Sequence, residues 1–581
     1  MKYLKIVAAS LLGAAALVSC NSQLDVDNLG GFASTEQKNQ VVSANPERIE
    51  ATVTGAAAAL NQYMLFGSRH NDFGYPSIML MLDHRGQDLV GLDVGYNWYG
   101  YYEDYSDVDY SYYMVKLIWQ QLYGQIKVAN NLTAATPAAS ATTDELKYIR
   151  AQALASRAFT YFNLAQLFQF TYKGNETKPC VPLVLDTNAD DAAANGCPRA
   201  TVQDVYTQIM KDLDEAVTLL SGNPTVRGDK RLFDECAARG LRARVELVMN
   251  DWDAAAADAQ YVIANSGATP LSQADASVPG FETLDADNML WGVVIAETDD
   301  VVKSGFVNFP SHMGSFNYGY ATVGAWRKIN KGLYNSIPAT DVRKNWFLDD
   351  AGESAGLTTA QQNYITSKGA PAYTQVKFAP YKGELGTSTN ACDVPLMRIE
   401  EMYLILAEAQ AMGSAGAATG KATLQSFVST YRDPAYTTSV STPTGVQEEV
   451  WMQRRVELWG EGQSYFDILR LNKGIDRRGG GYDAAYVLVI AAGDPCQIYP
   501  IPLSEINSNA QISEEDNNPT ATQPKPVADE ADPAAIHDVL STKSGQIIQY
   551  YDAQGLRLSK PQRGVNIIRY EDGTCRKMII K

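Results

Sequence analysis

The side chains best suited to binding lie in one tyrosine-rich stretch, residues 95–113. Its aromatic residues alternate with glycine, asparagine and carboxylates, and no lysine or arginine interrupts them: Tyr96, Trp98, Tyr99, Tyr101, Tyr102, Tyr105, Tyr110, Tyr112 and Tyr113. The glycines and polar residues predict a loop. Flat aromatic faces beside carboxylates and amides favour an uncharged polyhydroxylated ligand such as a sugar. We therefore predict ligand contacts from Tyr96, Asn97, Trp98, Tyr99, Tyr101, Tyr102 and Tyr105, and core positions for Tyr112 and Tyr113.

A second aromatic cluster could form the opposite wall of a cleft. Phe316, Tyr318, Tyr320 and Trp326 alternate with Gly314, Asn317 and Gly319. Of these, we predict that Tyr318, Tyr320 and Trp326 contact the ligand, with Arg327 and Asp341 as polar companions. Two other interpretations fit both clusters: the rings could pack the loops onto their own helices, or they could contact a partner protein, since Tyr and Trp are enriched at interfaces.

One segment matches the G-x-S-x-G pattern of hydrolases, Gly352 to Gly356 around Ser354. A nucleophile elbow needs a buried strand before the serine and a histidine later in the chain. Acidic residues precede this segment, and the only histidine downstream is His537, within a segment rich in Pro, Ala and Asp. We therefore predict no catalytic residue, and a binding protein instead of an enzyme.

Neither metal ligands nor a cofactor site can be recognised from residue spacing. His70, His84 and His312 are isolated in the sequence, and Asp83, Asp88 and Asp93 lack the alternation and glycine of a calcium loop. The cysteines after Cys20 form no C-x-x-C pair: Cys180, Cys197, Cys236, Cys392, Cys496 and Cys575. Cys180 and Cys197 flank a loop and could form a disulfide, which spacing alone does not establish. No metal and no cofactor are predicted.

The overall composition is that of a folded, acidic protein. Of 581 residues, 45% are hydrophobic and 20% charged, which excludes a polytopic membrane protein and a largely disordered chain. The net charge of -18 argues against binding of nucleic acid, which needs a cationic surface. The chain holds 33 Tyr but only 4 His, and this balance favours binding over catalysis.

The first twenty residues resemble a bacterial lipoprotein signal. Lys2 and Lys5 precede an apolar run over residues 6–18, which closes with Leu17-Val18-Ser19-Cys20. The run is too short for a stable membrane anchor. The resemblance implies a signal peptide over residues 1–19 and acylation of Cys20 as the mature N-terminus; the alternative is a plain secretory signal with an incidental cysteine.

Helical periodicity dominates the longer segments. Apolar residues over 252–263 recur at helical spacing after Asn250-Asp251, and the preceding residues 236–249 are also helix-compatible. The two segments predict a tight antiparallel helical pair, as in tetratricopeptide units. Further helices are predicted at about 50–66, 112–131, 143–169, 201–221, 396–411 and 446–472. Arg150 and Arg157 lie on one helix face and Glu457 and Glu461 lie one turn apart, which favours structural Arg/Glu pairing between helices.

The remaining segments predict a mainly α protein with additions. Between about 270 and 395, short apolar pieces among Gly, Pro and Asn indicate a loop-rich insertion. Residues 519–543 are predicted to be a linker, because Pro, Ala, Asp and Glu dominate 519–538. Three short strand-like segments follow and predict a small β module over residues 544–581.

Several segments in order resemble the SusD/RagB family, nutrient-binding outer-membrane lipoproteins of Bacteroidetes. They are residues 20–25, residues 150–170 with 182–184, residues 394–409, residues 453–470, and residues 499–506. Departures occur at Gln169, at Gln463-Ser464 and at residues 516–519, where the family has other residues. The similarity spans residues 20–518 and identifies these residues as a SusD-like domain.

The resemblance implies a function. Such a protein lies on the cell surface, anchored to the outer membrane by its lipid, and delivers a nutrient oligomer, here most simply an oligosaccharide, to a SusC-type TonB-dependent transporter. A peptide-binding, RagB-like member of the same family is an alternative, and it would depend more on backbone and end-group contacts than on stacking. A secreted hydrolase fits less well, because neither a nucleophile nor a base can be recognised.

Overall fold

The computed structural model describes residues 53–63, 69–92 and 95–529, and in the C-terminal part residues 547–552, 557–558, 560, 564–570 and 575–580. The predicted signal peptide and the predicted lipidation site Cys20 lie outside the described residues, as do Asp93 and residues 530–543 of the predicted linker.

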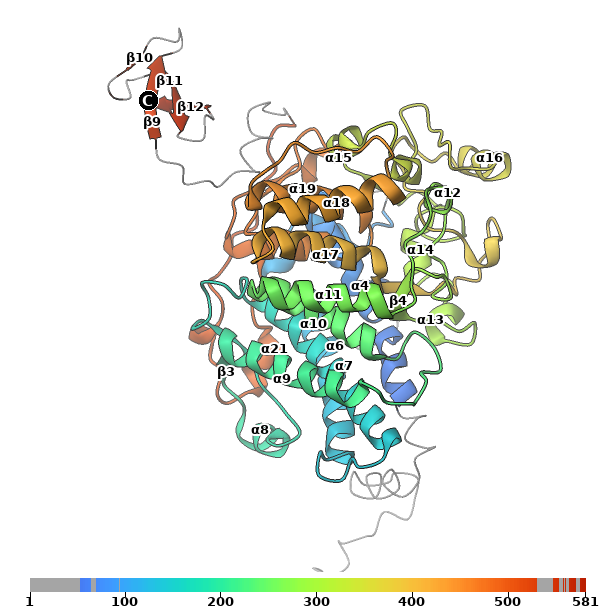
Figure 1. The fold of residues 1–581 in the computed structure, drawn as a ribbon, viewed down its shortest axis with the longest axis vertical. Coiled ribbons are helices and arrows are strands. Elements are labelled where there is room, and N and C mark those ends of the chain that lie inside the picture. Colours follow the sequence, from blue (N-terminus) through green and yellow to red (C-terminus); the bar gives the residue numbers. More distant parts are fainter. Residues whose placement is uncertain are drawn as a thin grey trace, which may run out of the picture.

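Long antiparallel helices form the frame of the molecule, in tiers that follow one another along the chain (Figure 1). In order of contact from one end, they are α6 (Tyr113–Ala135), α7 (Asp144–Phe168), α9 (Val202–Leu220), α10 (Glu235–Met249), α11 (Trp252–Asn265), α17 (Ile399–Met412), α18 (Ala417–Tyr431) and α19 (Pro443–Glu457). Each pair of helices buries an apolar face that neither helix could cover alone. The prediction of a mainly α fold built from helical pairs is confirmed.

The predicted pair at 236–263 is α10 and α11. The side chain of Asp234 accepts the amide of Ala237 and begins α10, and Asn250 ends it with a left-handed φ of 63°. Ala255, Ala259 and Val262 are fully buried, as the spacing predicts. These small side chains let α11 approach both α10 and α17, which pack on it.

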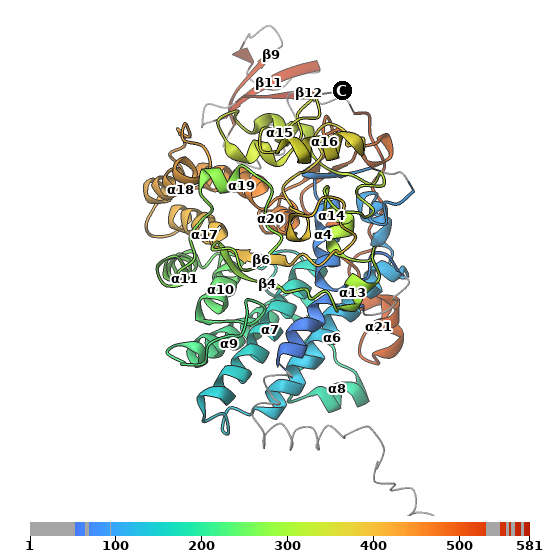
Figure 2. The ribbon, with the colours of Figure 1, turned by 90° about the vertical axis from the view of Figure 1, so that its right-hand side faces the viewer.

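Two predicted helices are wrong in part. The segment predicted as a helix over 396–411 begins as strand β6 (Val394–Arg398), which pairs with β4 (Met289–Val293). The segment over 446–472 is broken into α19 and α20 (Ser464–Arg470), because Gly460 and Gly462 between them take φ values of 76° and 72°. In Figure 2 the β4–β6 pair lies near the middle of the molecule.

Short elements of the N-terminal part and of the insertion lie beside the frame. They are β1 (Leu89–Gly91), α5 (Gly100–Glu103), η2 (Ser106–Val108), α12 (Gln273–Ala276), α13 (Asp300–Lys303), α14 (Phe309–Met313), β5 (Arg327–Ile329), α15 (Lys331–Ser336), η3 (Val342–Trp346) and α16 (Thr359–Ser367). Among them, α5, β1 and α14 contact α4 (Tyr75–Arg85), a helix whose residues are all buried. Strand β1 pairs antiparallel with β5, with Leu89 opposite Ile329 and Gly91 opposite Arg327. This pairing brings the segment after β1 close to the segment before β5, which are the two aromatic clusters of the sequence.

The other strands and helices are peripheral. They are β2 (Pro179–Pro182), α8 (Ala189–Asn195), β3 (Arg199–Thr201), β7 (Ile475–Asp476), β8 (Val489–Ile490) and α21 (Leu503–Ser508). The C-terminal sheet has the order β10-β9-β11-β12, formed by β9 (Ile547–Asp552), β10 (Arg557–Leu558), β11 (Gly564–Tyr570) and β12 (Cys575–Ile580). Three of these strands match the predicted ones, and the short β10 adds a fourth.

Buried charge pairs tie the frame to the insertion. Glu457 of α19 is fully buried between three arginines: Arg432 Nε lies 2.7 Å from its carboxylate, and Arg398 Nη1 and Arg343 Nη1 each lie 3.2 Å away. Burial alone would raise the pKa of Glu457, but the arginines hold it well below its usual value. The predicted structural pairing of Arg and Glu is confirmed for this residue.

The arginines of α7 pair with other partners. Arg157 Nε lies 2.7 Å from Asp212 and Arg150 Nε lies 2.6 Å from Glu215, both on α9. These pairs join neighbouring helices, as the sequence suggested, through carboxylates that the sequence did not single out.

Candidate functional site

The two aromatic clusters meet on one surface of the protein. The ring of Tyr96, from the segment after β1, lies 6.0 Å from that of Tyr320, from the segment before β5. Phe306 lies 5.4 Å from Tyr318 and 5.8 Å from Tyr320, ring to ring. Trp98 is joined to Tyr320 by His70, which contacts both rings. We call these five residues the aromatic platform: Tyr96, Trp98, Phe306, Tyr318 and Tyr320.

Three rings of the platform are open to solvent. The exposed fractions are 49% for Tyr96, 44% for Tyr318 and 37% for Phe306. Tyr320 is 8% exposed and joins them from below, and Trp98 is partly buried. Large aromatic faces gathered in this way on a surface mark a site of binding to a ligand or a partner.

Histidines support the platform from beneath. His70 stacks on Trp98 with ring centroids 4.3 Å apart, and its Nδ1 contacts the hydroxyl of Tyr320. His312 stacks on the ring of Tyr320 with centroids 4.7 Å apart, and its Nε2 lies 2.8 Å from the carbonyl oxygen of His70. Burial lowers the pKa of both histidines, which are therefore neutral near pH 7.

A buried carboxylate fixes the loop that carries Tyr96 and Trp98. Glu103 accepts hydrogen bonds from the side-chain amide of Asn97 at 2.8 Å and from the backbone amide of Gly91 at 2.7 Å, and His84 Nδ1 lies 3.3 Å from it. Burial lowers the pKa of His84 to about 4. Asn97, predicted to contact the ligand, thus has its amide engaged by Glu103 and holds the loop in place.

Four of the predicted ligand contacts are wrong. Tyr99, Tyr102 and Tyr105 are fully buried, and Trp326 is 3% exposed. The ring of Tyr99 packs between His84 and His312, and its hydroxyl lies 3.1 Å from Ser77 Oγ.

The short helices α5 and η2 turn the other two tyrosines inward. Tyr102 receives a hydrogen bond from Asn71, and Tyr105 donates to the carbonyl oxygen of Arg85. Trp326 directly precedes β5 and is buried beside the β1–β5 pair.

The other predicted positions divide between surface and core. Tyr101 is 48% exposed on α5, whereas Tyr112, predicted for the core, is 45% exposed. Arg327 and Asp341, predicted as polar companions, are both buried: Arg327 lies with its guanidinium 6.0 Å from the ring of Tyr99, and Asp341 pairs with Arg343 at 2.6 Å. Neither reaches the exposed rings.

Sequence reasoning missed two parts of the site. Phe306 is a single aromatic residue beside Gly305, and nothing in its neighbours marks it. His70 and His312 are far apart in the sequence, so only the fold shows that both contact the ring of Tyr320.

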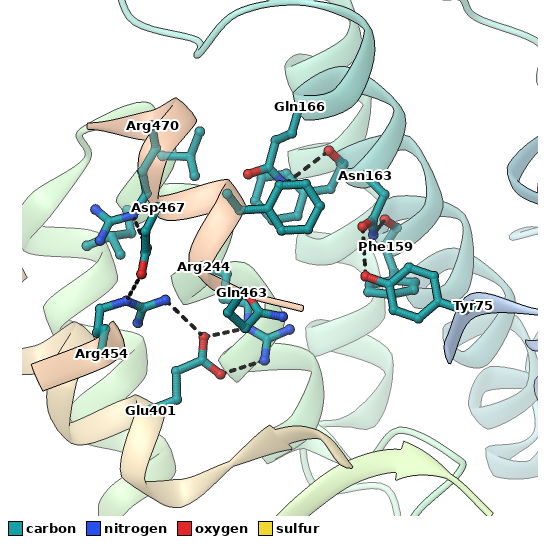
Figure 3. Close-up of a pocket in the computed structure, with 14 residues that line it drawn as sticks. Tyr75, Phe159, Asn163, Gln166, Arg244, Glu401, Arg454, Gln463, Asp467 and Arg470 are labelled. Carbon is teal, nitrogen blue, oxygen red and sulfur yellow. Dashed lines mark hydrogen bonds and ion pairs between the residues drawn. The ribbon is translucent and has the colours of Figure 1, made fainter. Parts of the chain in front are cut away.

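A small cavity of about 30 Å³ lies elsewhere, between the helical frame and α20 (Figure 3). Arg244 bonds to Glu401 at 2.8 Å and Arg454 to Asp467 at 2.7 Å along its wall. The cavity has room for about two water molecules and is part of the buried charge network of the frame.

The described residues offer no metal centre: within them, no group of three or more His, Cys, Asp or Glu could hold an ion. Ser354 of the G-x-S-x-G match donates to the carbonyl oxygen of Asn345 at 2.6 Å and follows no strand. Cys180 and Cys197 are free thiols. Of the helices described, none combines the length and apolar character that crossing a bilayer requires.

Two family profiles match this chain. Residues 82–247 match the family profile described as "Starch-binding associating with outer membrane", and residues 318–520 match the profile of the SusD family. The chain belongs to the SusD/RagB family. The resemblance seen in the sequence is thereby confirmed.

Relatives of this SusD-family protein agree with the assignment. The curated SusD-like protein P2 of Formosa agariphila is 25% identical over 398 residues, which are 62% of this chain and 72% of that protein. A solved structure described as a SusD-like carbohydrate binding protein from Bacteroides vulgatus superposes with a TM-score of 0.67 at 22% identity, over 81% of this chain and 98% of the other. A laminarin binding SusD-like protein gives a TM-score of 0.57 at 19% identity, over 81% and 99%. These likenesses show the fold.

Proposed function

We propose that this SusD-family protein binds an oligosaccharide on the aromatic platform and leaves its bonds intact. The observation that carries the proposal is the exposure of Tyr96, Phe306 and Tyr318, at 49%, 37% and 44%, on rings joined through Tyr320. Sugar rings present flat C–H faces that stack on such side chains, while tyrosine hydroxyls at their edges can exchange hydrogen bonds with sugar hydroxyls.

The chemistry of the platform favours a neutral saccharide over a peptide. None of the five platform side chains carries a formal charge at neutral pH, and the two histidines beneath them are neutral because burial lowers their pKa values. A peptide site would be expected to offer a strand edge or charged groups for chain ends. The solved relatives described as carbohydrate binding and laminarin binding support the same choice.

The proposed role is capture and delivery. We propose that acylation of Cys20 tethers the protein to the outer membrane and that it hands its ligand to a SusC-type TonB-dependent transporter. Stacking with a few hydrogen bonds gives modest affinity, which suits a protein that must release its ligand. Labelling of the protein with a fatty acid tests the tether, because the label should be lost in Cys20→Ser. Co-purification with a barrel protein from the outer membrane tests the partner.

Calorimetry against a panel of neutral oligosaccharides and mixed peptides tests the function. Saturable binding of at least one saccharide is expected, with no change in the saccharide after incubation. The binding must weaken in the double variant Tyr96→Ala/Tyr318→Ala and persist in Tyr112→Ala, which removes an equally exposed tyrosine outside the platform. Binding of peptides alone, or any hydrolysis of the saccharide, would overturn the proposal.

A further inference from the structure

A second cleft opens between α6, α8 and α21, a region that Figure 2 shows at the lower right of the molecule. Its volume is about 630 Å³, within the range of sites that hold small molecules. Tyr123 of α6 lines it with a partly exposed side chain and packs on the buried ring of Trp119, with the two centroids 4.7 Å apart. No platform residue lines it.

The rim of this cleft is held rigidly by side chains from distant parts of the sequence. Asn509 accepts a hydrogen bond from the backbone amide of Cys197 at 3.0 Å and donates to the carbonyl oxygen of Cys197 at 2.8 Å. Glu505 accepts from Asn509 at 2.8 Å and from Trp119 Nε1 at 3.2 Å. Gly196 allows this approach, because a side chain there would meet the side-chain oxygen of Asn509. A preformed site loses little entropy when a ligand binds.

Small residues from α8 and α21 also line the cleft, among them Ala192, Ala193 and Ser508. Tyr123 is partly exposed, and the exposed Lys127, one turn further along α6, lines the cleft beside it. The polar residues Ser504, Ser508 and Gln120 line the same cleft as Tyr123. Ring surface beside small polar groups suits a sugar better than a wholly apolar ligand.

We propose that this cleft is a second saccharide-binding site, large enough for a short stretch of a neutral oligosaccharide. The inference goes beyond the proposed function, because it concerns a different surface and does not depend on the platform. A protein with two such sites would hold a longer polymer at two points, which raises its effective affinity without tighter binding at either one.

Cys197 provides a reporter for this site, because its free thiol is partly exposed and lines the cleft. The purified protein is treated with N-ethylmaleimide, and modification of the peptide that contains Cys197 is followed by mass spectrometry. Burial raises the pKa of this thiol, so the reaction is run at mildly alkaline pH. Laminarihexaose, maltohexaose, cellohexaose and xylohexaose are the probes, and sorbitol at equal mass is the control.

At least one hexasaccharide is expected to slow the modification of Cys197 about tenfold at ten times its dissociation constant, because only about a tenth of the sites are then free. The protection must persist in Tyr96→Ala/Tyr318→Ala and disappear in Ser508→Trp, which fills the cleft. Asn507→Trp, on the same short helix but outside the cleft, is the matched control and must keep it.

Calorimetry supplies a second readout that needs no thiol. The platform double variant should retain one saccharide site, and adding Ser508→Trp should remove it. The second site would be overturned if none of the four saccharides protected Cys197 and none bound to the platform double variant. This holds whether or not the platform itself binds a saccharide. Protection that is lost in the platform variant but kept in Ser508→Trp would also overturn it, because the effect would then come from the platform.

Discussion

His70 lies flat against Trp98, with 4.3 Å between the ring centroids and 10° between the planes. One face of Trp98 is therefore already covered by protein, and Tyr320 meets the same histidine edge-on at 5.4 Å. Trp98, the most obvious stacking residue of the sequence, thus serves partly to support the platform. The most exposed rings of the platform are Tyr96 and Tyr318, and the predictions about binding concern these two first.

Tyr96→Ala and Tyr318→Ala should each weaken saccharide binding by about 1–2 kcal/mol, because each removes an exposed stacking ring. The free energy of unfolding should change by less than about 0.5 kcal/mol, since both side chains are nearly half exposed. Calorimetry and urea denaturation of the same samples measure the two quantities. An unchanged binding isotherm for both variants would remove these rings from the site.

Tyr99→Ala should reduce the stability of the protein, in contrast to the two exposed tyrosines. The side chain is fully buried between His84 and His312, so its loss leaves a cavity and should reduce the free energy of unfolding by about 3–5 kcal/mol. Urea denaturation measures this, with Tyr101→Ala as the exposed control two residues later. A stability equal to that of the control would contradict the buried position of Tyr99.

The fold could be predicted wherever one helix face differs from the other. The spacing of Ala255, Ala259 and Val262 identifies α11, because a helix between two neighbours must bury one stripe. The same reasoning fails for α4, whose residues are all buried, so that no face stands out. Local pattern also cannot show that residues 394–398 pair with β4 as a strand, since that depends on a distant partner.

The aromatic composition of the two segments predicts where the site lies, but it does not predict which of their side chains point outward. The sequence singles out both aromatic clusters, and the β1–β5 pairing that joins them is a contact between distant segments. Tyr96 and Tyr99 have the same residue type and similar neighbours, yet one is half exposed and the other buried. What separates them is the turn into α5 and the packing on α4, which residue type does not encode.

Glu457→Gln should destabilise the protein by about 3–5 kcal/mol, because Arg343, Arg398 and Arg432 would lose a buried counter-charge. Glu384→Gln, which changes an exposed carboxylate, serves as the control and should have little effect. Thermal or urea unfolding measures both. A small effect at Glu457 would show that its neighbours Glu400 and Glu461 can compensate the arginines.

Glu246→Gln should stabilise the protein at alkaline pH. The side chain is 5% exposed, and burial, with Asp258 nearby, raises the pKa of Glu246 to about 8. Between about pH 4.5 and 8 the unfolded chain has lost this proton while the folded chain keeps it, so the free energy of unfolding of the wild type falls as pH rises. The variant lacks this dependence and should be more stable by about 1–3 kcal/mol at pH 8, with little difference at pH 5. Parallel stability curves from pH 5 to 8 would be the contrary result.

His84 should make the protein sensitive to acid. Burial lowers the pKa of His84 to about 4, whereas in the unfolded chain it titrates near 6.5. As pH falls from 6.5 to 4, the unfolded state takes up this proton first, so the stability that the neutral ring contributes at pH 7 is lost over that window. The shift corresponds to about 3 kcal/mol.

The variant His84→Phe keeps an aromatic ring against Tyr99 but cannot take up a proton. Urea unfolding from pH 4 to 7.5 should therefore show a shallower loss of stability for the variant than for the wild type, although His312 contributes in the same direction in both. Identical pH slopes for wild type and variant would show that another group causes the acid sensitivity.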